Sequence, residues 1–275
     1  MPKKVDYNLN GYIPSPVDER DYTADKIFSA PVAEFPSAYR TEGNVPVLNQ
    51  GANCDCVAHA IAVAMAYGEC KLFNNKFNDY SRGYIYGNRR ALDWKGEGMC
   101  IRSALKQLNH DGDCLYKVFP KQGPYKVVRA LIDEKAEEYA KAAEPYKILN
   151  YFRLYSENEI KQAIMAQGAV VVGMTLYEDF GPNVSVPTTE SKRSGGHAMC
   201  CIGWDETGWI IQNSWGKGWG KSGCCHVPYE YVVDEWWGIT VSPLLPTPNK
   251  DTWYVRLSNA IKNMFLWLKQ HLFRK

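Results

Sequence analysis

Apolar residues in this 275-residue chain follow one pattern before Pro145 and another after it, and few folds accommodate both. Before Pro145 they recur at helical spacing, which predicts helices over residues 54–71, 81–91, 101–110 and 127–144. After Pro145, short runs rich in Val, Ile, Tyr and Trp are separated by Gly, Asp and Pro, which is typical of β-strands. Helices in the first half and strands in the second predict an α+β protein with a helical lobe and a β-rich lobe.

The second half contains several predicted strands and one predicted helix. Residues 146–155 are predicted as the first strand, and the runs AVVVGMTLY, HAMCCIGW, GWIIQN and WWGITVS as later ones. Between the first two strands, Ser156 and Glu159 have the spacing of a capping box, in which each side chain bonds the other residue's backbone. We therefore expect a helix that begins at Ser156 and ends at Gly168.

The two ends of the chain differ from the part between them. Residues 1–33 are rich in Pro, Asp and Tyr and show no sustained periodicity, so we expect an extended arm on the surface. Residues 34–242 are predicted to form the main domain, and the Pro-rich residues 243–250 to form a linker. Residues 251–275 are predicted to form a separate helix.

The predicted C-terminal helix is basic and amphipathic. Its apolar stripe consists of Trp253, Leu257, Ile261, Met264, Leu268 and Leu272. The segment has five basic residues and one acidic residue, a net charge of +4, which leaves −2 for residues 1–250 out of the total of +2. Such a helix lies on a membrane surface, enters the groove of a partner protein, or packs against its own domain. Its charges are too frequent for a membrane-spanning helix.

Charge and cysteine content exclude several classes of protein. Lys and Arg number 32 against 30 Asp and Glu, so we expect no nucleic-acid partner. The start MPKKVDYNLNGY lacks the apolar stretch of a secretory signal, and we expect a cytoplasmic protein with reduced thiols. Nine cysteines cannot all pair with one another. They include no C-x-x-C pair, so we expect no metal site, and nothing in the sequence indicates a cofactor.

Cys56 is placed for thiol chemistry. Asp55 is a suitable N-cap, which places Cys56 in the first turn of helix 54–71, where the helix N-terminus is expected to lower the thiol pKa. The Asp55 carboxylate opposes thiolate formation, and we expect it to turn away and cap the helix. A reversible disulfide between Cys54 and Cys56 is a second hypothesis, although so small a ring is strained.

Other polar residues complete a thiol-hydrolase pattern. Six residues before Cys56, Gln50 provides an amide that can face a developing oxyanion. His197 starts a predicted strand and Asn213 ends the next one, so a hairpin between these strands brings Asn213 to His197. An amide fixes the tautomer of the imidazole without adding charge. We expect His59 and the remaining histidines to be structural.

Three separate blocks of the sequence resemble the signature of the papain-like cysteine peptidases. They are residues 49–56 (NQGANCDC), 196–198 (GHA) and 212–220 (QNSWGKGWG), in the order and near the separations of that family. The resemblance covers residues 34–242 and implies a papain-like fold with a cleft between the two lobes. It implies Cys56 as the nucleophile, His197 as the general base and acid, and Asn213 as the residue that orients His197.

The same resemblance assigns roles around the reacting groups. It implies that Gln50 and the Cys56 backbone N–H stabilise the oxyanion, and that Trp215 shields the histidine–asparagine contact. The residues expected to line the substrate cleft are Gly98, Met99 and Trp215.

The expected activity is hydrolysis of peptide bonds in a peptide or protein substrate, as an endopeptidase. Where the family has Cys, Ser and Trp, this sequence has Asn53, Asp55 and Val57. These departures motivate an alternative, a catalytically inactive papain-like module that binds a partner and is anchored by its C-terminal helix. The sequence outside the three blocks is similar to that of bacterial members of the family, so we expect a bacterial or phage-encoded protein.

Overall fold

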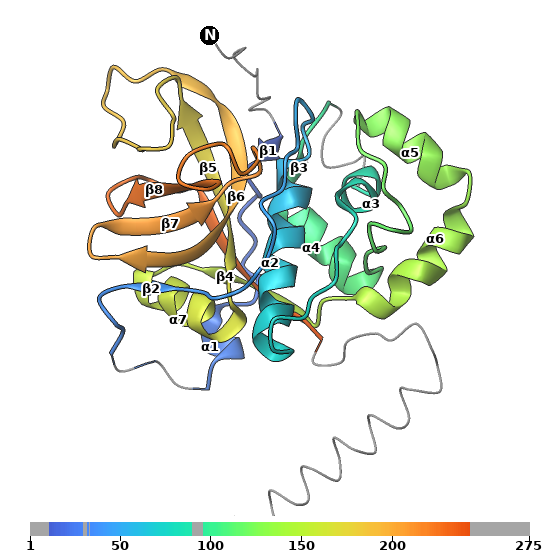
Figure 1. Cartoon of the computed structure of the whole chain (residues 1–275), viewed down its shortest axis with the longest axis horizontal. Coiled ribbons are helices and arrows are strands. Elements are labelled where there is room, and N and C mark those ends of the chain that lie inside the picture. Colours follow the sequence, from blue (N-terminus) through green and yellow to red (C-terminus); the bar gives the residue numbers. More distant parts are fainter. Residues whose placement is uncertain (1–10, 30–31, 33, 90–95, 243–275) are drawn as a thin grey trace, which may run out of the picture. The chain divides into compact units, whose positions relative to one another are not determined.

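The computed structural model describes residues 11–29, 32, 34–89 and 96–242. The predicted linker (243–250) and C-terminal helix (251–275) lie outside the described residues. Helices α2 to α6 gather on one side, and the large sheet lies on the other together with α1 and α7 (Figure 1), which confirms the predicted α+β fold with a helical lobe and a β-rich lobe. No helix in the described ranges is long and apolar enough to cross a membrane.

The helical lobe contains the helices expected from apolar spacing, with two differences, the first being that the helix predicted over 81–91 already ends at Gly87. They are α2 (Cys56–Leu72), α3 (Arg82–Gly87), α4 (Ile101–His110), α5 (Tyr125–Asp133) and α6 (Ala136–Ala143), followed by a short 3-10 helix (Glu144–Tyr146). The single helix predicted over 127–144 is wrong, because Lys135 leaves the helical conformation (φ −142°, ψ 41°) and separates α5 from α6. This break lets Ile132 of α5 and Ala143 of α6 join the same buried cluster.

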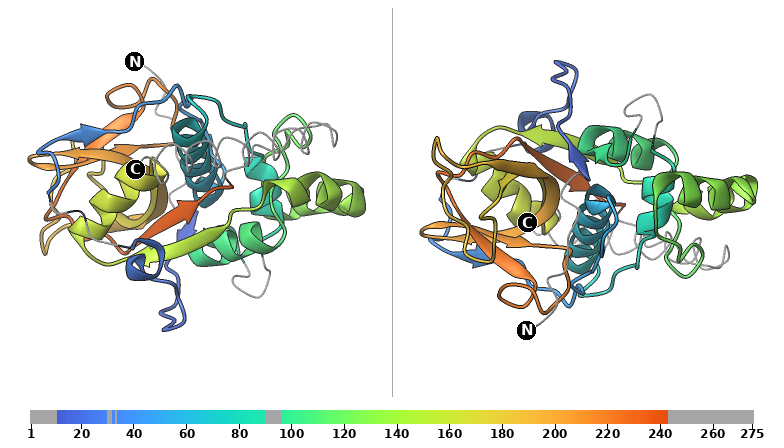
Figure 2. Two further views of the ribbon diagram at one scale, coloured as in Figure 1. Left: turned by 90° about the horizontal axis from the view of Figure 1, so that it is seen from below. Right: turned by 90° about the horizontal axis from the view of Figure 1, so that it is seen from above.

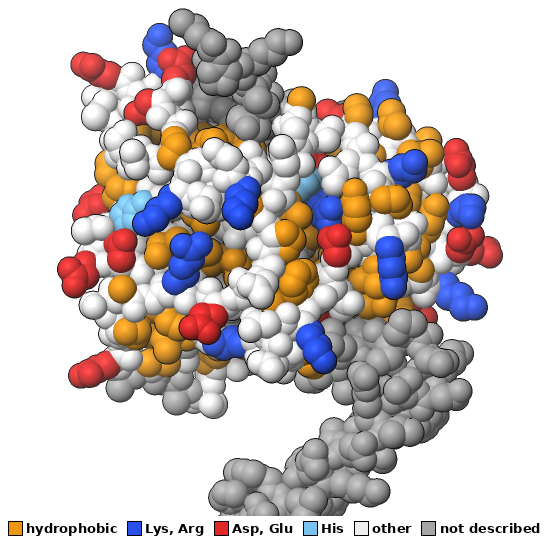
Figure 3. Space-filling view, in the orientation of Figure 1, with side chains coloured by type: hydrophobic (Ala, Val, Ile, Leu, Met, Phe, Trp, Pro, Cys, Tyr) orange, Lys and Arg blue, Asp and Glu red, His pale blue; other side chains and the backbone are white. Residues whose placement is uncertain are grey.

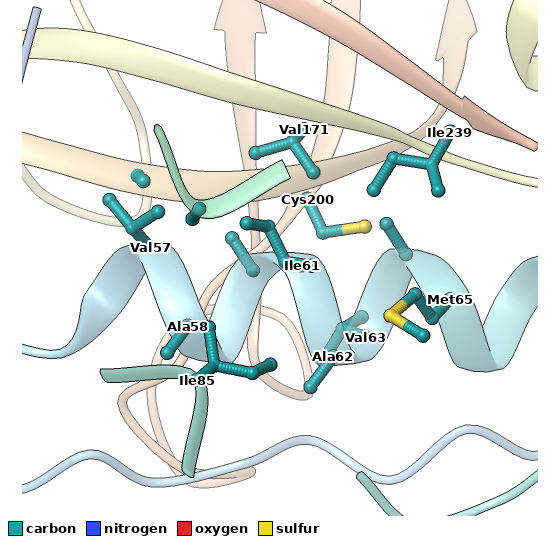
Figure 4. Close-up of a cluster of buried hydrophobic side chains, with 14 of the residues drawn as sticks. Val57, Ala58, Ile61, Ala62, Val63, Met65, Ile85, Val171, Cys200 and Ile239 are labelled. Carbon is teal, nitrogen blue, oxygen red and sulfur yellow. The ribbon is translucent and has the colours of Figure 1, made fainter. Parts of the chain in front are cut away.

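Helix α2 lies between the sheet and the other helices of the helical lobe (Figure 1). All residues from Cys56 to Cys70 are buried, as is typical of a helix that is apolar on every side. Figure 4 shows Ile61 next to Val171 of the sheet, while Ala58 lies against Ile85 of α3 on the opposite side. The helix is thereby fixed relative to both lobes.

The β-rich lobe is built on a seven-stranded sheet. Its strands are β2 (Tyr39–Arg40), β4 (Asn150–Leu154), β5 (Val170–Tyr177), β6 (Arg193–Asp205), β7 (Gly208–Gln212), β8 (Cys224–Pro228) and β9 (Glu235–Thr240). The order is β4-β9-β5-β6-β7-β8, and β2 pairs with β6. Strands β4, β5, β6, β7 and β9 confirm the predicted strands, whereas the sequence did not predict β2 or β8.

Helix α7 (Glu157–Gln167) packs against this sheet through Ile160 and Ile164 (Figure 2). It begins with the predicted capping box. The Glu159 N–H donates to Ser156 Oγ at 3.3 Å, and the Glu159 carboxylate accepts the Ser156 N–H at 3.2 Å. The helix ends before Gly168, whose φ of 87° favours glycine, and the chain then enters β5.

The N-terminal arm enters the molecule instead of lying on it. Its elements are β1 (Tyr12–Ile13), which pairs in parallel with β3 (Met99–Cys100), and α1 (Ala24–Ile27). Tyr12 and Ser15 are buried, so the surface position predicted for the arm is wrong at these residues. Farther along, the Arg153 N–H of β4 donates to the Tyr22 carbonyl at 2.7 Å.

Two buried contacts fasten the arm to the two lobes. The backbone N–H and hydroxyl of Ser15 donate to Glu235 Oε1 of β9 at 3.1 and 3.0 Å. The Arg102 guanidinium of α4 donates twice to Asp21 Oδ2, at 2.6 and 3.1 Å. Hydrogen bonds to charged partners are the stronger kind, so these contacts hold the arm in place.

Acidic and basic side chains are interspersed on the face of the molecule shown in Figure 3, without an extended area of one sign. This distribution reflects the near balance of 32 basic and 30 acidic residues in the chain.

Candidate active site

Cys56 is the first residue of α2 and is fully buried. Asp55 is the N-cap residue, as the sequence predicts. Its carboxylate makes no capping bond, however, so the expectation that it caps the helix is wrong. The carboxylate lies instead 3.3 Å from Nδ1 of His59, one helical turn further along.

His197 and Asn213 come from neighbouring strands, because His197 lies in β6 and Asn213 directly follows β7. His197 Nε2 donates to Asn213 Oδ1 at 2.8 Å, and the same oxygen accepts the Ser214 N–H at 2.7 Å. Since Oδ1 is the acceptor of both bonds, the neutral imidazole carries its proton on Nε2 and a lone pair on Nδ1. Nδ1 has no hydrogen-bond partner among the described residues.

The Cys56 sulfur lies beside the strand that carries His197. The N–H of Ala198, the residue after His197, donates to this sulfur. Helix α2 and strand β6 thus meet at the Cys56 sulfur and the residue that follows His197. A thiol that reaches an imidazole whose Nδ1 is unbonded can transfer its proton to that nitrogen.

Burial decides the protonation of both groups in this structure. It raises the pKa of the Cys56 thiol to about 12, although the Ala198 N–H acts in the opposite direction. It lowers the pKa of His197 to about 4, against the effect of the bond to Asn213. The N–H of Val57, in the first turn of α2, also lowers the Cys56 pKa, as expected of a helix N-terminus, but loss of water has the larger effect and the net pKa is raised. Thiol and imidazole are therefore both neutral at pH 7.

Trp215 stacks on the imidazole of His197, with ring centroids 4.9 Å apart and planes inclined by 27°. Trp219 and Phe180 pack edge-on against Trp215 at 5.1 and 6.0 Å and hold it in place. The sequence predicts Trp215 as a shield of the histidine–asparagine contact, and the structure places it against the ring that makes this contact.

Gln50 joins the segment before α2 to the loop after β7. Its Oε1 accepts the Ser214 hydroxyl at 2.5 Å, and its backbone N–H donates to the Ser214 carbonyl at 2.9 Å. Its Nε2 donates to the Asn53 carbonyl at 2.8 Å, which uses one of the two N–H donors of the amide. The buried Gln50 side chain therefore belongs to the same network as Asn213, and its role toward an oxyanion stays a prediction.

The N-terminal arm covers Cys56. A Cβ added at Gly11 would lie 2.7 Å from the Cys56 sulfur and 2.9 Å from the carbonyl of Cys54. The Gly11 carbonyl accepts the Met99 N–H at 3.0 Å, which extends the pairing of β1 with β3. The turn predicted to line the substrate cleft, Gly98 and Met99, thus lies against the backbone of the arm.

Arg89 holds this turn in position. Its guanidinium donates to the carbonyls of Gly96 and Gly98, and it lies 4.0 Å from the ring centroid of Tyr125. Gly98 has a φ of 94°, a conformation that favours glycine. No sequence pattern indicated Arg89, because its partners are backbone carbonyls.

The position of the arm over Cys56 could not be predicted from the sequence either, since the arm contains no recognisable motif. The Asp55–His59 pair, in contrast, has an i, i+4 spacing that can be recognised on a predicted helix. All nine cysteines are buried free thiols, so Cys54 and Cys56 are not joined here. Within the part of the chain that the structure describes, no group of three or more His, Cys, Asp or Glu side chains is placed to hold a metal ion.

Comparison with known sequences matches this chain to a family of cysteine proteases. A family model described as papain family cysteine protease matches residues 39–242. An uncharacterized peptidase C1-like protein of Acanthamoeba polyphaga mimivirus is 30% identical over 209 residues, which are 68% of this chain and 66% of that protein. Cathepsin B-like cysteine proteinase 3 of Ostertagia ostertagi is 43% identical over 70 residues, 23% of this chain and 40% of that protein. The chain thus spans less than two thirds of either relative.

Solved structures show the same fold. Xylellain, a cysteine protease from Xylella fastidiosa, superposes with a TM-score of 0.73 at 25% identity, over 88% of this chain and 99% of that one. A procathepsin B of Trypanosoma congolense shares the fold with a TM-score of 0.67 at 15% identity, over 86% and 87% of the two chains. The chain therefore belongs to the papain family of cysteine proteases.

Proposed function

We propose that this protein hydrolyses peptide bonds as an endopeptidase, through an acyl-enzyme on Cys56. One observation carries the proposal. Asn213 accepts the Nε2–H of His197, which leaves Nδ1 of His197 unbonded. Ala198, the next residue of the same strand, donates its N–H to the Cys56 sulfur. This arrangement supplies a nucleophile, a base and a residue that orients the base.

The reaction follows from these positions. Nδ1 of His197 takes the thiol proton, and the Cys56 sulfur bonds to the scissile carbonyl carbon. The carbon–nitrogen bond breaks, and the His197 imidazolium gives its proton to the leaving amine. Water then attacks the thioester, giving a proton to His197, and the carboxylic acid leaves as the proton returns to sulfur. Gln50 and the Cys56 N–H are proposed to stabilise the oxyanion.

Substrate can reach Cys56 only after the arm leaves. In the arm-covered structure, Cys56 and His197 have no exposed surface and are both neutral. Departure of the segment around Gly11 readmits water, which lowers the cost of charging both groups and so favours the thiolate–imidazolium pair.

A digest of a peptide library tests the proposal. The wild-type chain should cleave internal peptide bonds, and Cys56→Ala should not. The matched control is Cys70→Ala, which removes another buried free thiol from the same helix and should keep the activity. Cleavage by Cys56→Ala at the wild-type rate contradicts the proposal.

The alternative is an inactive module that binds through the papain-like fold. The buried carboxylate of Asp55 next to Cys56 favours it, because a negative charge there opposes the thiolate. The epoxide inhibitor E-64 separates the two functions. A stoichiometric adduct on Cys56 contradicts the inactive module, whereas no adduct in a variant whose arm is displaced supports it.

A contact of residues 251–275 with a membrane surface or a partner protein is proposed on the sequence pattern alone. The full chain should float with anionic liposomes, and a chain truncated after residue 245 should not. Equal flotation of the two contradicts the membrane contact.

A further inference from the structure

A cavity of about 670 Å³ remains open beside the covered thiol. The arm supplies one part of its lining, residues 12–14. The turn at Gly96 and Glu97 supplies a second part, and residues 193–196 at the start of β6 supply a third. Cys54, two residues before the predicted nucleophile, also lines the cavity. The cavity is therefore complete only while the arm lies over Cys56.

Short contacts hold the arm between the other two parts of this lining. On one side, Tyr12 of β1 pairs with Met99 of β3 (Figure 1). On the other side, a Cβ added at Gly196 of β6 would lie 2.5 Å from the Tyr12 carbonyl. A Cβ added at Gly173 of β5 would lie 2.4 Å from the Tyr12 ring. Tyr12 thus bridges β3 and the main sheet, with its ring packed against the sheet.

The arm gives the cavity an apolar surface. Successive side chains of a strand point to opposite sides, so Ile13 points away from the buried ring of Tyr12. Ile13 is half-buried and Pro14 is exposed, and both line the cavity. A ligand with apolar side chains can therefore bury them against the arm itself.

The rest of the lining carries two opposite charges, one on each side of the arm. The Glu97 carboxylate is held in place by the Tyr86 hydroxyl and the Tyr125 N–H, which both donate to it. A carboxylate has about four acceptor sites, so Glu97 can accept further donors. On the side of β6, the exposed Arg193 guanidinium makes no hydrogen bond within the described residues. The buried hydroxyl oxygen of Ser194, next to it, has no partner there either.

We propose that this cavity binds a short apolar peptide with free ends, the product class of the proposed hydrolysis, and that the bound peptide holds the arm over Cys56. The peptide's ammonium group binds Glu97, and its carboxylate binds Arg193 and Ser194. Because the site needs the arm in place, the peptide binds the arm-covered state and thereby stabilises it. Feedback by product rests on the proposed function, whereas the binding itself does not.

The test measures hydrogen exchange at two backbone amides of the full chain by NMR, with the dipeptide Leu-Leu as the probe. The Met99 N–H donates to the Gly11 carbonyl at 3.0 Å, and the Ser15 N–H donates to Glu235 at 3.1 Å. Both amides lose these bonds when the arm leaves. At ten times the dissociation constant of Leu-Leu, both should exchange about tenfold more slowly. Alkylation of Cys56 by iodoacetamide, followed by mass spectrometry, should slow by the same factor.

The direction of the change in exchange distinguishes this cavity from the surface beneath the arm. A dipeptide that bound at the uncovered Cys56 would compete with the arm. The amides of Met99 and Ser15 would then exchange faster, although alkylation of Cys56 would still slow. Faster exchange, or exchange that Leu-Leu leaves unchanged, would overturn the inference.

Two controls test the assigned charges. Arg193→Met removes the partner of the peptide's carboxylate and should raise the Leu-Leu concentration needed for the effect about tenfold. The matched control is Lys192→Met, because Lys192 is exposed and does not line the cavity. N-acetyl-Leu-Leu amide lacks both end charges and should leave exchange unchanged. Equal dependence on Leu-Leu in the two variants, or slowing by the blocked dipeptide, would contradict the inference.

Each rate is compared with and without dipeptide in the same variant, so a shift of the arm caused by the substitution cancels. Cys56→Ala should show the same slowing of exchange as wild type, since binding needs no peptide cleavage. Failure of the proposed hydrolysis appears in the library digest, and failure of this inference appears in the exchange rates.

Discussion

Gly11 of the N-terminal arm lies directly against the sulfur of Cys56, and no side chain larger than hydrogen fits between them. A Cβ at Gly11 would be 2.7 Å from Cys56 Sγ, well inside van der Waals contact. Cys56 itself has no exposed surface. The position of the arm therefore controls whether the thiol can react.

Gly11→Ala should displace the arm and expose Cys56. The added methyl group would overlap the Cys56 sulfur and the Cys54 carbonyl, and an overlap of this kind costs about 1–3 kcal/mol. Alkylation of Cys56 should become about tenfold faster as the arm-covered state loses this free energy. Gly218→Ala is the control, because nothing lies within 4 Å of a Cβ at Gly218. An unchanged alkylation rate in Gly11→Ala would show that another segment protects the thiol.

Arg102→Met should loosen the same arm from a distance. The substitution removes both guanidinium bonds to Asp21, and hydrogen bonds to charged groups contribute about 1.5–3 kcal/mol each. We expect faster alkylation of Cys56 with little change in the unfolding temperature of the two lobes. Arg129→Met provides the comparison, since Arg129 pairs with Asp133 within α5. Equal rates for Arg102→Met and wild type would contradict a fastening role of Arg102.

Acid should destabilise the arm-covered structure through His197. Its pKa is about 4 in this structure against 6.5 for an ordinary histidine, so the unfolded chain binds more protons between these values. The free energy of unfolding should fall as the pH drops from 6.5 to about 4. His197→Gln lacks the titrating group, and its loss of stability over this range should be smaller. Parallel unfolding curves for the two proteins would contradict the buried neutral histidine.

Gln50→Ala should lower kcat by about 10²–10³-fold, the usual loss when one oxyanion donor is removed. The Michaelis constant should change little, because the oxyanion develops only in the transition state. Gln107→Ala is the control for loss of a buried glutamine, since Gln107 lies in α4. An equal loss of kcat in both variants would point to general destabilisation.

Local signals explain which parts of the fold could be predicted from the sequence. The boundaries of α7 depend on Ser156, Glu159 and Gly168, all within or next to the helix, and the structure confirms them. The division of the predicted helix over 127–144 at Lys135 depends on packing against a distant cluster, which no local pattern encodes. Strand β8 was missed for a similar reason, because its pairing with β7 decides its conformation.

The candidate site shows the same limit. Three sequence blocks indicated Cys56, His197 and Asn213. The structure shows the bond between His197 and Asn213 and a bond from Ala198, the residue after His197, to the Cys56 sulfur, while the reaction of Cys56 with His197 stays a prediction. The position of Asp55 at the helix start was predictable from its propensity, but the direction of its side chain was not. That direction depends on His59 and on exclusion of water, both consequences of the tertiary structure.

The arm stays attached to the body even when its covering part leaves the site. Among the described strands, the two-residue strand β1 pairs with β3 alone, whereas Tyr22 is bonded separately to Arg153 of the main sheet. Residues near Gly11 can therefore peel away while the rest of the arm remains bound. A short flexible tether keeps such a segment at an effective concentration of about millimolar. In the proposed hydrolysis, every peptide substrate would compete with this internal occupant, so weakly bound peptides would be excluded and the apparent Michaelis constant would rise without any change in the reacting groups.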